Sequence, residues 1–124
     1  MSARPVTHRQ ALGRWGETLA AEHLSQKGYI LLDRNARTPY GELDLVTRQG
    51  GVIVFVEVKT RASSGFGLPE DSVTPKKQAH LLAAAQYYLQ AHPDYVGDWR
   101  VDVIAIRRQP GVPPEVVHFE NVLH

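Results

Sequence analysis

The chain has 124 residues, of which 43% are hydrophobic, and these totals suit one globular domain spanning residues 1–124. It contains no cysteine, which excludes disulfides and thiolate metal sites and fits a reducing, cytoplasmic compartment. We find no signal-peptide core and no run of roughly 20 apolar residues, so we expect no membrane segment. The formal net charge of +1 neither indicates nor excludes a nucleic-acid partner, because clustered carboxylates would cancel basic residues elsewhere.

Hydrophobic periodicity predicts a long first helix followed by paired strands. From about Thr7 to Lys27 apolar residues recur at helical spacing, and Gly28 is a natural stop. The segment from Tyr29 to about Arg37 is typical of a strand that leads into a turn. The next strand, GELDLVTR, begins at Gly41. The Gly50-Gly51 pair after it predicts a hairpin to the strand that follows.

The second half of the chain completes a predicted α/β fold. Residues 52–60, VIVFVEVKT, begin with an apolar run that is typical of a central strand covered on both faces. A second helix is expected from Thr74-Pro75 to about His92, because Thr can cap a helix and Pro suits its first turn. Residues 99–107 predict another strand, and 115–120 a candidate edge strand. We therefore expect a central mixed β-sheet flanked by helices, in the order α-β-β-β-α-β with a candidate last edge strand. The core of this domain should lie in residues 7–107, with a turn and the edge strand in 108–124.

The central strand carries two charges where apolar residues are expected. Because side chains alternate along a strand, Glu57 and Lys59 share a face with Ile53 and Phe55. Burying either charge alone would cost several kcal/mol, so each needs a partner. One interpretation is an ordinary Glu–Lys ion pair at a strand end that emerges into solvent. The other is a functional site.

Asp44 favours the functional interpretation. It interrupts the apolar residues Leu43 and Leu45 in the strand that the hairpin folds against the strand of Glu57. Residues opposite each other in such a pair have side chains about 5 Å apart, so two carboxylates would repel unless a cation or a proton intervened. A hard divalent cation such as Mg²⁺ takes carboxylate oxygens and fills its other positions with water and phosphate. Lys59 could then hold a water or a phosphate oxygen without competing for the metal.

These residues resemble a known nuclease signature. Asp44 followed by Glu57-Val58-Lys59 matches the PD-(D/E)xK pattern, with Leu43 in place of the usual proline. The surrounding segments GRWGETLAAEHLSQKGY, YGELDLV, VFVEVKTR and TPKKQAHLLAAAQYYL resemble the YraN-like family of small bacterial proteins. That family is similar in layout to archaeal Holliday-junction resolvases. The resemblance implies a restriction-endonuclease-like fold and metal-dependent hydrolysis of phosphodiester bonds in DNA, with branched or structured DNA as one substrate.

The resemblance also implies a role for each residue of the site. Asp44 and Glu57 would bind Mg²⁺ or Mn²⁺, and the backbone carbonyl of Val58 would complete the protein ligands. Lys59 would orient or activate the attacking water. Glu17 matches the helix acid of the resolvase pattern and would act on the metal directly or through water. It borders the apolar face of the first helix, so the alternative for Glu17 is a solvated boundary glutamate.

Residues around this site are candidates for contacts with DNA. Lys76 and Lys77 lie in the first turn of the second helix, where they oppose the helix dipole. We expect them either to contact backbone phosphates or to be simply solvated. Gln78 points inward at the same end and could support the site or act as a capping or packing residue. The further candidates, on the central strand, in the loop after it and on the first helix, are Arg61, residues 65–67 and Arg14.

Asp102, in the strand RVDVIAI, differs from the acids of the site. It shares a face with Ile104 and Ile106, and no second acid accompanies it, so we expect buried hydrogen bonds rather than metal binding. The six histidines have no spacing typical of a zinc site and are interpreted as surface or packing residues.

Three hypotheses about function follow. The first is a metal-dependent DNA endonuclease; one site per chain cuts one strand, so paired cuts would require a homodimer with two-fold symmetry. The second is a catalytically silent nucleic-acid-binding accessory module that keeps the nuclease fold. The third is an interaction domain in which Glu57 and Lys59 form a surface ion pair. The joint presence of Asp44, Glu57 and Lys59 favours the first.

Overall fold

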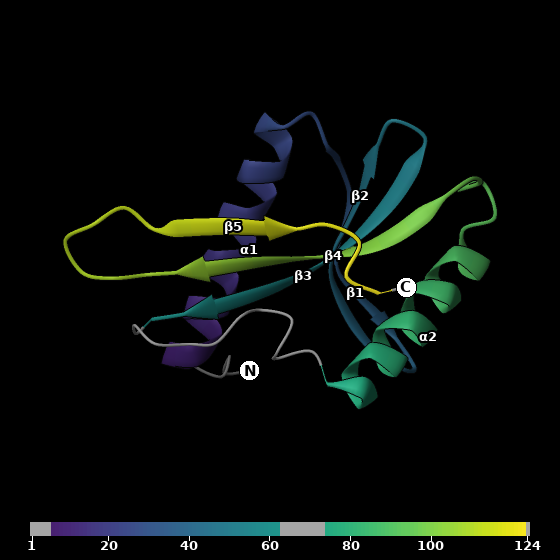
Figure 1. The fold of residues 1–124 in the computed structure, drawn as a ribbon. Helices are drawn as coiled ribbons and strands as arrows, with labels where there is room; N and C mark the ends of the chain where they lie inside the picture. Colours follow the sequence, from purple (N-terminus) through teal and green to yellow (C-terminus); the bar gives the residue numbers. More distant parts are fainter. Residues whose placement is uncertain (1–5, 63–73, 124) are drawn as a thin grey trace, which may run out of the picture.

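The computed structural model describes residues 6–62 and 74–123, which form two helices and five strands (Figure 1). The helices are α1 (His8–Gln26) and α2 (Pro75–Ala91). The strands are β1 (Ile30–Thr38), β2 (Gly41–Gln49), β3 (Val52–Arg61), β4 (Trp99–Arg107) and β5 (Glu115–Phe119). The predicted elements are all present in the predicted order, and the candidate edge strand forms as β5. The predicted α/β fold is confirmed.

The strands form one mixed sheet in the order β1-β2-β3-β4-β5. The first three strands are joined as antiparallel hairpins, and β5 returns antiparallel to β4. β3 and β4 are parallel, and α2 lies in the connection between them. A parallel pair needs such a crossover, because a tight turn can join only antiparallel strands. β3 is therefore a central strand with a bonded neighbour on each side.

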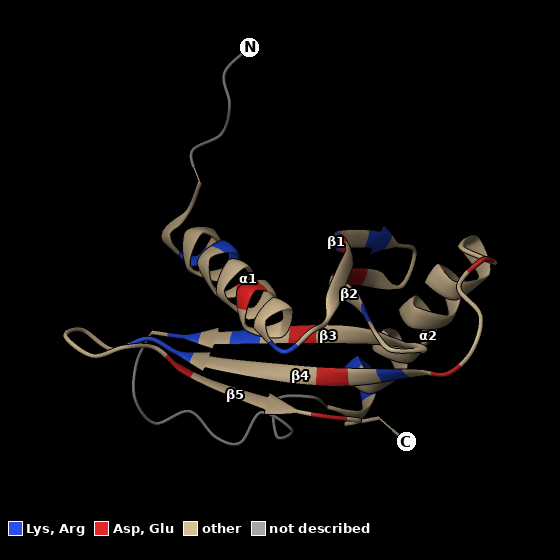
Figure 2. Cartoon of the chain, turned by 90° about the horizontal axis from the view of Figure 1, so that it is seen from above, with Lys and Arg blue, Asp and Glu red and all other residues tan. Residues whose placement is uncertain are grey.

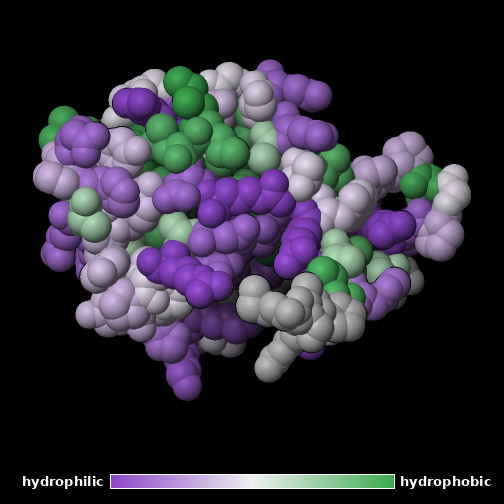
Figure 3. All heavy atoms as spheres, turned by 180° about the vertical axis from the view of Figure 1, so that it is seen from behind, coloured by the Kyte–Doolittle hydropathy of each residue, from purple (hydrophilic) through white to green (hydrophobic). Residues whose placement is uncertain are grey.

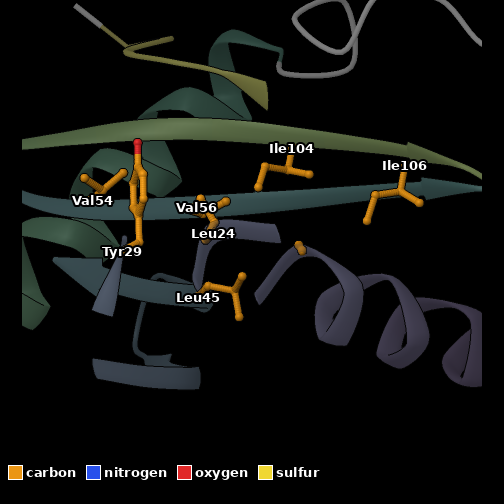
Figure 4. Packing of buried hydrophobic residues seen from close by; sticks show 8 residues of the cluster. Leu24, Tyr29, Leu45, Val54, Val56, Ile104 and Ile106 are labelled. Carbon is orange, nitrogen blue, oxygen red and sulfur yellow. The ribbon is translucent and has the colours of Figure 1, made fainter. Parts of the chain in front are cut away.

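The two helices cover opposite faces of the sheet. Val54 and Val56 of β3 pack in a cluster with α1, whereas the alternate residues Ile53 and Phe55 pack in a cluster with α2. Figure 4 shows the α1-side cluster, in which Leu24 of α1 lies beside side chains from β2, β3 and β4. Coverage on both faces explains why this stretch of β3 is apolar at every position.

Both helices begin with a threonine cap. Thr7 Oγ1 accepts the backbone N–H of Gln10 at 3.0 Å, and the Gln10 side chain accepts the Thr7 N–H at 3.0 Å. Thr74 Oγ1 accepts the backbone N–H of Lys77 at 3.2 Å, and Pro75 fills the first helical position. Of the helices in the described part of the chain, neither combines the length and hydropathy needed to cross a membrane.

α1 approaches β3 closely at Gly16. A Cβ atom added there would overlap Oγ1 of Thr60 and lie 3.0 Å from its Cβ. Glu17 directly follows Gly16, and Thr60 directly follows Lys59. The contact between glycine and threonine therefore fixes the position of Glu17 relative to the charged end of β3.

We expect Gly16→Ala to lower the free energy of unfolding by about 1 kcal/mol, because overpacking outweighs the gain of alanine over glycine inside a helix. Gly13→Ala is the matched control, since nothing lies within 4 Å of a Cβ added there on the same helix. That variant should be stabilised by up to about 1 kcal/mol. Denaturant unfolding measures both changes. Equal stabilisation of the two variants would contradict the close contact of α1 with β3.

Asp102 is fully buried and hydrogen-bonded, as predicted. Its carboxylate accepts Nε of Arg100 at 3.0 Å and the backbone N–H of Asn121 at 2.9 Å, and Nε2 of His118 lies 2.8 Å away. Burial would raise the pKa of Asp102, but hydrogen bonds from His118 and Arg100 outweigh burial and hold this pKa below its usual value. Of the two interpretations of the histidines, packing holds for His118: its side chain is 4% exposed and is also the partner of a buried carboxylate.

Candidate active site

The polar residues of the candidate site lie where the pairing of β2 with β3 ends. The last pair of this ladder is Leu45 with Val56, so Asp44 and Glu57 occupy the next positions on the two strands. β2 remains paired with β1 as far as Gly41, and Figure 2 shows the β1–β2 hairpin turning away from the plane of β3, β4 and β5. The strands separate at this point, so backbone groups of β3 become accessible to side chains.

Asp44 occupies the opening between the two strands. Its Oδ2 accepts the backbone N–H of Val58 at 2.9 Å. Because the N–H and C=O groups of one strand residue point to the same side, the Val58 carbonyl also faces the side of Asp44. The carbonyl and the carboxylate of Asp44, two of the predicted ligands, therefore meet at one end of the sheet.

The surroundings of Asp44 disfavour its negative charge. Burial raises its pKa most, the neighbouring carboxylate of Glu57 raises it further, and Glu17 adds a smaller repulsion. The hydrogen bond from Val58 and the charge of Lys59 act in the opposite direction. The balance raises the pKa of Asp44 to about 8. At neutral pH this carboxyl group therefore keeps its proton unless a cation compensates the charge.

Glu57 and Lys59 lie side by side at the end of β3. Lys59 Nζ is 3.2 Å from Glu57 Oε1, and the two side chains are 18% exposed for Glu57 and 20% exposed for Lys59. Both line a cavity together with Lys77 and His80 of α2, which covers the face of Ile53 and Phe55, so the four β3 residues share a face, as predicted. This ion pair is largely sheltered, unlike a pair that emerges into solvent.

Glu17 reaches the site from the α1 side. Its Oε1 accepts the side-chain N–H of Asn35 at 3.0 Å and lies 3.8 Å from Nε of Arg34. The same Asn35 amide donates to Glu42 at 3.0 Å. The Glu17 side chain is 15% exposed, so it is a bonded, sheltered carboxylate rather than an open solvated one. Its charge is close enough to raise the pKa of Asp44.

The oxygen atoms at this end of the sheet fit a hard divalent ion. Asp44 and Glu57 supply carboxylates that repel each other, and the Val58 carbonyl supplies a third oxygen on the same side. Within residues 6–62 and 74–123, no three His, Cys, Asp or Glu side chains form a group that could hold a metal ion. An ion here would therefore depend on two carboxylates, one carbonyl and water, a ligand set that suits Mg²⁺.

The predicted DNA contacts on α2 differ in their distance from the site. Lys77 lines the cavity that Glu57 and Lys59 enter, which places it beside the site. Lys76 is exposed on the first turn of the helix, and Gln78 is half-buried, as expected for an inward-pointing residue. Lys77 is thus the α2 residue best placed to meet a phosphate next to the site.

The other predicted DNA contacts lie around the site. Arg61 is exposed at the end of β3, and its guanidinium donates to the Thr60 carbonyl at 3.1 Å. Arg14 is exposed on α1 and lines a polar cleft of about 520 Å³ that also contains Glu17. The face behind the view of Figure 1 is mostly hydrophilic, with hydrophobic residues gathered near its upper edge (Figure 3). The predicted contact of residues 65–67 lies outside the described residues.

The sequence did not indicate two features of the site. Asn35 joins Glu17 to Glu42, and its backbone φ of 54° is in the left-handed region, which asparagine tolerates better than most residues. Tyr40 and His80 line the cavity beside the Glu57–Lys59 pair although they belong to a turn and a helix far apart in the chain. Their only sequence signal is residue type, which does not distinguish them from other exposed polar residues.

The residues of the site lie within the part of the chain that a protein-family model matches. The model of the uncharacterised protein family UPF0102 matches residues 16–106. A UPF0102 protein of Syntrophomonas wolfei is 51% identical over 100 residues, covering 81% of this chain and 87% of the relative. One of Syntrophotalea carbinolica is 49% identical over 111 residues, with 90% and 89% covered. One of a Nocardioides species is 48% identical over 121 residues, with 98% of each chain covered.

Proposed function

The chain belongs to the uncharacterised protein family UPF0102, and we propose that it is a metal-dependent nuclease that hydrolyses phosphodiester bonds in DNA. The observation that carries this proposal is the half-buried carboxyl of Asp44, with its raised pKa, beside Glu57 at the opening between β2 and β3. Two partly buried carboxylates that repel each other lower the stability of the fold. A divalent cation bound between them offsets this repulsion. Lys59 beside them supplies a positive charge without a competing oxygen ligand.

The protein ligands would be Asp44, Glu57 and the Val58 carbonyl. A divalent ion bound there would withdraw charge from the phosphate and make a nearby water more acidic. Glu17 is placed to act on the ion through water from the α1 side, because Asn35 and Arg34 hold its carboxylate near Asp44 and no third acidic side chain joins Asp44 and Glu57 in a metal-holding group among the described residues. This arrangement suits Mg²⁺ or Mn²⁺, which accept oxygen ligands and retain water.

Lys59 would position the attacking water and the phosphate. Its ammonium group, oriented by Glu57 at 3.2 Å, can donate to a water and to a phosphate oxygen at the same time. Attack in line forms a bond from the water oxygen to phosphorus and breaks the bond to the 3′ oxygen. The attacking water gives up one proton to solvent, the 3′ oxygen takes up one proton from solvent and leaves as a hydroxyl, and the phosphate remains on the 5′ end of the other fragment.

The proposal is tested by incubating the protein with branched, single-stranded and linear duplex DNA, each with Mg²⁺, Mn²⁺ or a chelator. We expect cleavage with either metal, none with chelator, and none by Glu57→Gln, because an amide cannot replace the second carboxylate. Glu22→Gln is the matched control, since Glu22 is exposed on α1, and it should cleave like the wild type.

The other results separate the remaining hypotheses. Binding of DNA at low salt without metal-dependent cleavage of any substrate would contradict the nuclease and favour a silent binding module. Absence of both binding and cleavage would leave an interaction domain. Circular dichroism of each variant shows that a loss of cleavage does not come from unfolding.

A further inference from the structure

A cavity opens directly beside the Glu57–Lys59 pair. Its volume is about 220 Å³, and its lining comes from the β1–β2 turn, the end of β3 and the first half of α2. Glu57 and Lys59 contribute only part of this lining. If the phosphate is cleaved beside Glu57 and Lys59, the rest of the cavity can hold another part of the substrate.

The remaining lining combines an aromatic ring with aliphatic residues. Tyr40 is 51% exposed, and its ring meets that of Tyr87 edge to face, with centroids 6.4 Å apart at an angle of 68°. Leu81 and Ala84 of α2 contribute the apolar part of the lining. An open aromatic ring next to aliphatic side chains offers a surface on which another flat ring can stack.

The size and the polar groups of the cavity restrict its occupant. At about 220 Å³ it is smaller than the roughly 300–1,000 Å³ typical of sites for drug-sized ligands, so it suits one flat ring system rather than a whole nucleotide. Glu42 and His80 can exchange hydrogen bonds with the edge of such a ring. Lys59 and Lys77 place positive charge on the same lining, where a phosphate attached to that ring would lie.

We propose that this cavity receives the base of the nucleotide next to the phosphate held at Lys59. The inference rests on the proposed nuclease function and specifies its substrate class. In a duplex each base is stacked and paired, so a base can enter a pocket only where the strand is unpaired or the nucleotide is extruded. The site therefore acts fastest on nucleic acid with unpaired nucleotides, which need no extrusion, and stacking on Tyr40 accepts any base because every base has a π face.

The test compares single-stranded and fully paired DNA of one sequence, with the position of the cut mapped first. A single abasic nucleotide is then placed next to the cut in the single strand. The wild type should cleave the intact single strand about tenfold faster than either the duplex or the abasic strand. A factor of about ten is the effect expected from the loss of one stacking contact between a base and an aromatic ring. Tyr40→Ala should lower cleavage of the intact strand by about the same factor and add no further loss on the abasic strand.

His80→Ala should also reduce the preference for the intact strand, and His8→Ala is its matched control. His8 is an exposed histidine at the start of α1 and is not part of the cavity lining, so its variant should keep the full preference. Tyr40 and His80 are both exposed, so neither substitution removes a core contact, and circular dichroism verifies the fold.

The measured rates and affinities decide the proposal. Equal cleavage of paired, unpaired and abasic DNA, or a Tyr40→Ala effect that persists on abasic DNA, would overturn the base pocket and leave the nuclease function intact. Cleavage of no substrate would contradict the nuclease function, and fluorescence anisotropy then tests the cavity by itself. Tighter binding of the intact than of the abasic strand, lost in Tyr40→Ala, would support the base pocket, and equal binding would overturn it.

Discussion

Lys59→Met is expected to slow DNA cleavage by about 10²–10³-fold while leaving divalent metal binding in place. The ammonium group of Lys59 lies 3.2 Å from Glu57 and carries positive charge to the phosphate, but it supplies no oxygen ligand to an ion. Methionine preserves the packing of an unbranched side chain and removes only the charge and the donors. Single-turnover kinetics measures the cleavage, and calorimetric titration with Mn²⁺ measures the binding.

Two further variants separate this prediction from a general loss of structure. Asp44→Asn should lose both cleavage and metal binding, because it removes a ligand. Lys27→Met should cleave like the wild type, since Lys27 lies beside His118 of β5 and away from the site. Loss of metal binding in Lys59→Met, or normal cleavage by it, would contradict the role assigned to this residue.

Metal binding is expected to weaken about 50-fold between pH 8, where about half of Asp44 is ionised, and pH 6, where about 1% is. An ion can bind only after Asp44 loses its proton, and the pKa of Asp44 is raised to about 8, first by burial and then by Glu57. Below this pKa the apparent affinity falls about tenfold for each pH unit. Titration at about pH 6 should also release about one proton per ion, which calorimetry in buffers of different ionisation enthalpy detects.

The raised pKa of Asp44 also makes the stability of the metal-free fold depend on pH. The pKa of Asp44 is higher in the folded than in the unfolded chain, so the folded chain binds the proton more tightly. The free energy of unfolding therefore falls progressively as the pH rises from about 4 to 8 and Asp44 ionises. Asp44→Asn should lose this dependence, whereas Asp94→Asn, an exposed control, should keep it. A metal affinity independent of pH across this interval would contradict the shifted carboxyl.

The sheet and the charged end of β3 could be predicted because their signals are local. The glycines at 50 and 51 mark the hairpin, and the alternation along β3 assigns Glu57 and Lys59 to one face. The register of that hairpin then places Asp44 next to Glu57, as the observed pairing of Leu45 with Val56 requires. Short-range patterns of residue type were sufficient for these features.

Other parts of the site depend on packing between distant segments, which residue patterns do not encode. The position of Glu17 depends on how closely α1 approaches Thr60 and on Asn35, whose left-handed backbone gave no signal. The pairing of His118 with Asp102 arises only when β5 adds to the edge of the sheet. The cavity likewise exists only because the crossover brings α2 beside the turn that contains Tyr40.

The most direct test of the proposed site is the position of Mn²⁺ in crystals of the protein, located by anomalous X-ray scattering. We predict one ion bound by carboxylate oxygens of Asp44 and Glu57 and by the carbonyl of Val58, with water in its other positions. Crystals grown above pH 8 favour this result, because Asp44 is then ionised. Absence of an ion between these residues at saturating Mn²⁺, or an ion bound only elsewhere, would contradict a metal-dependent site at the end of β3.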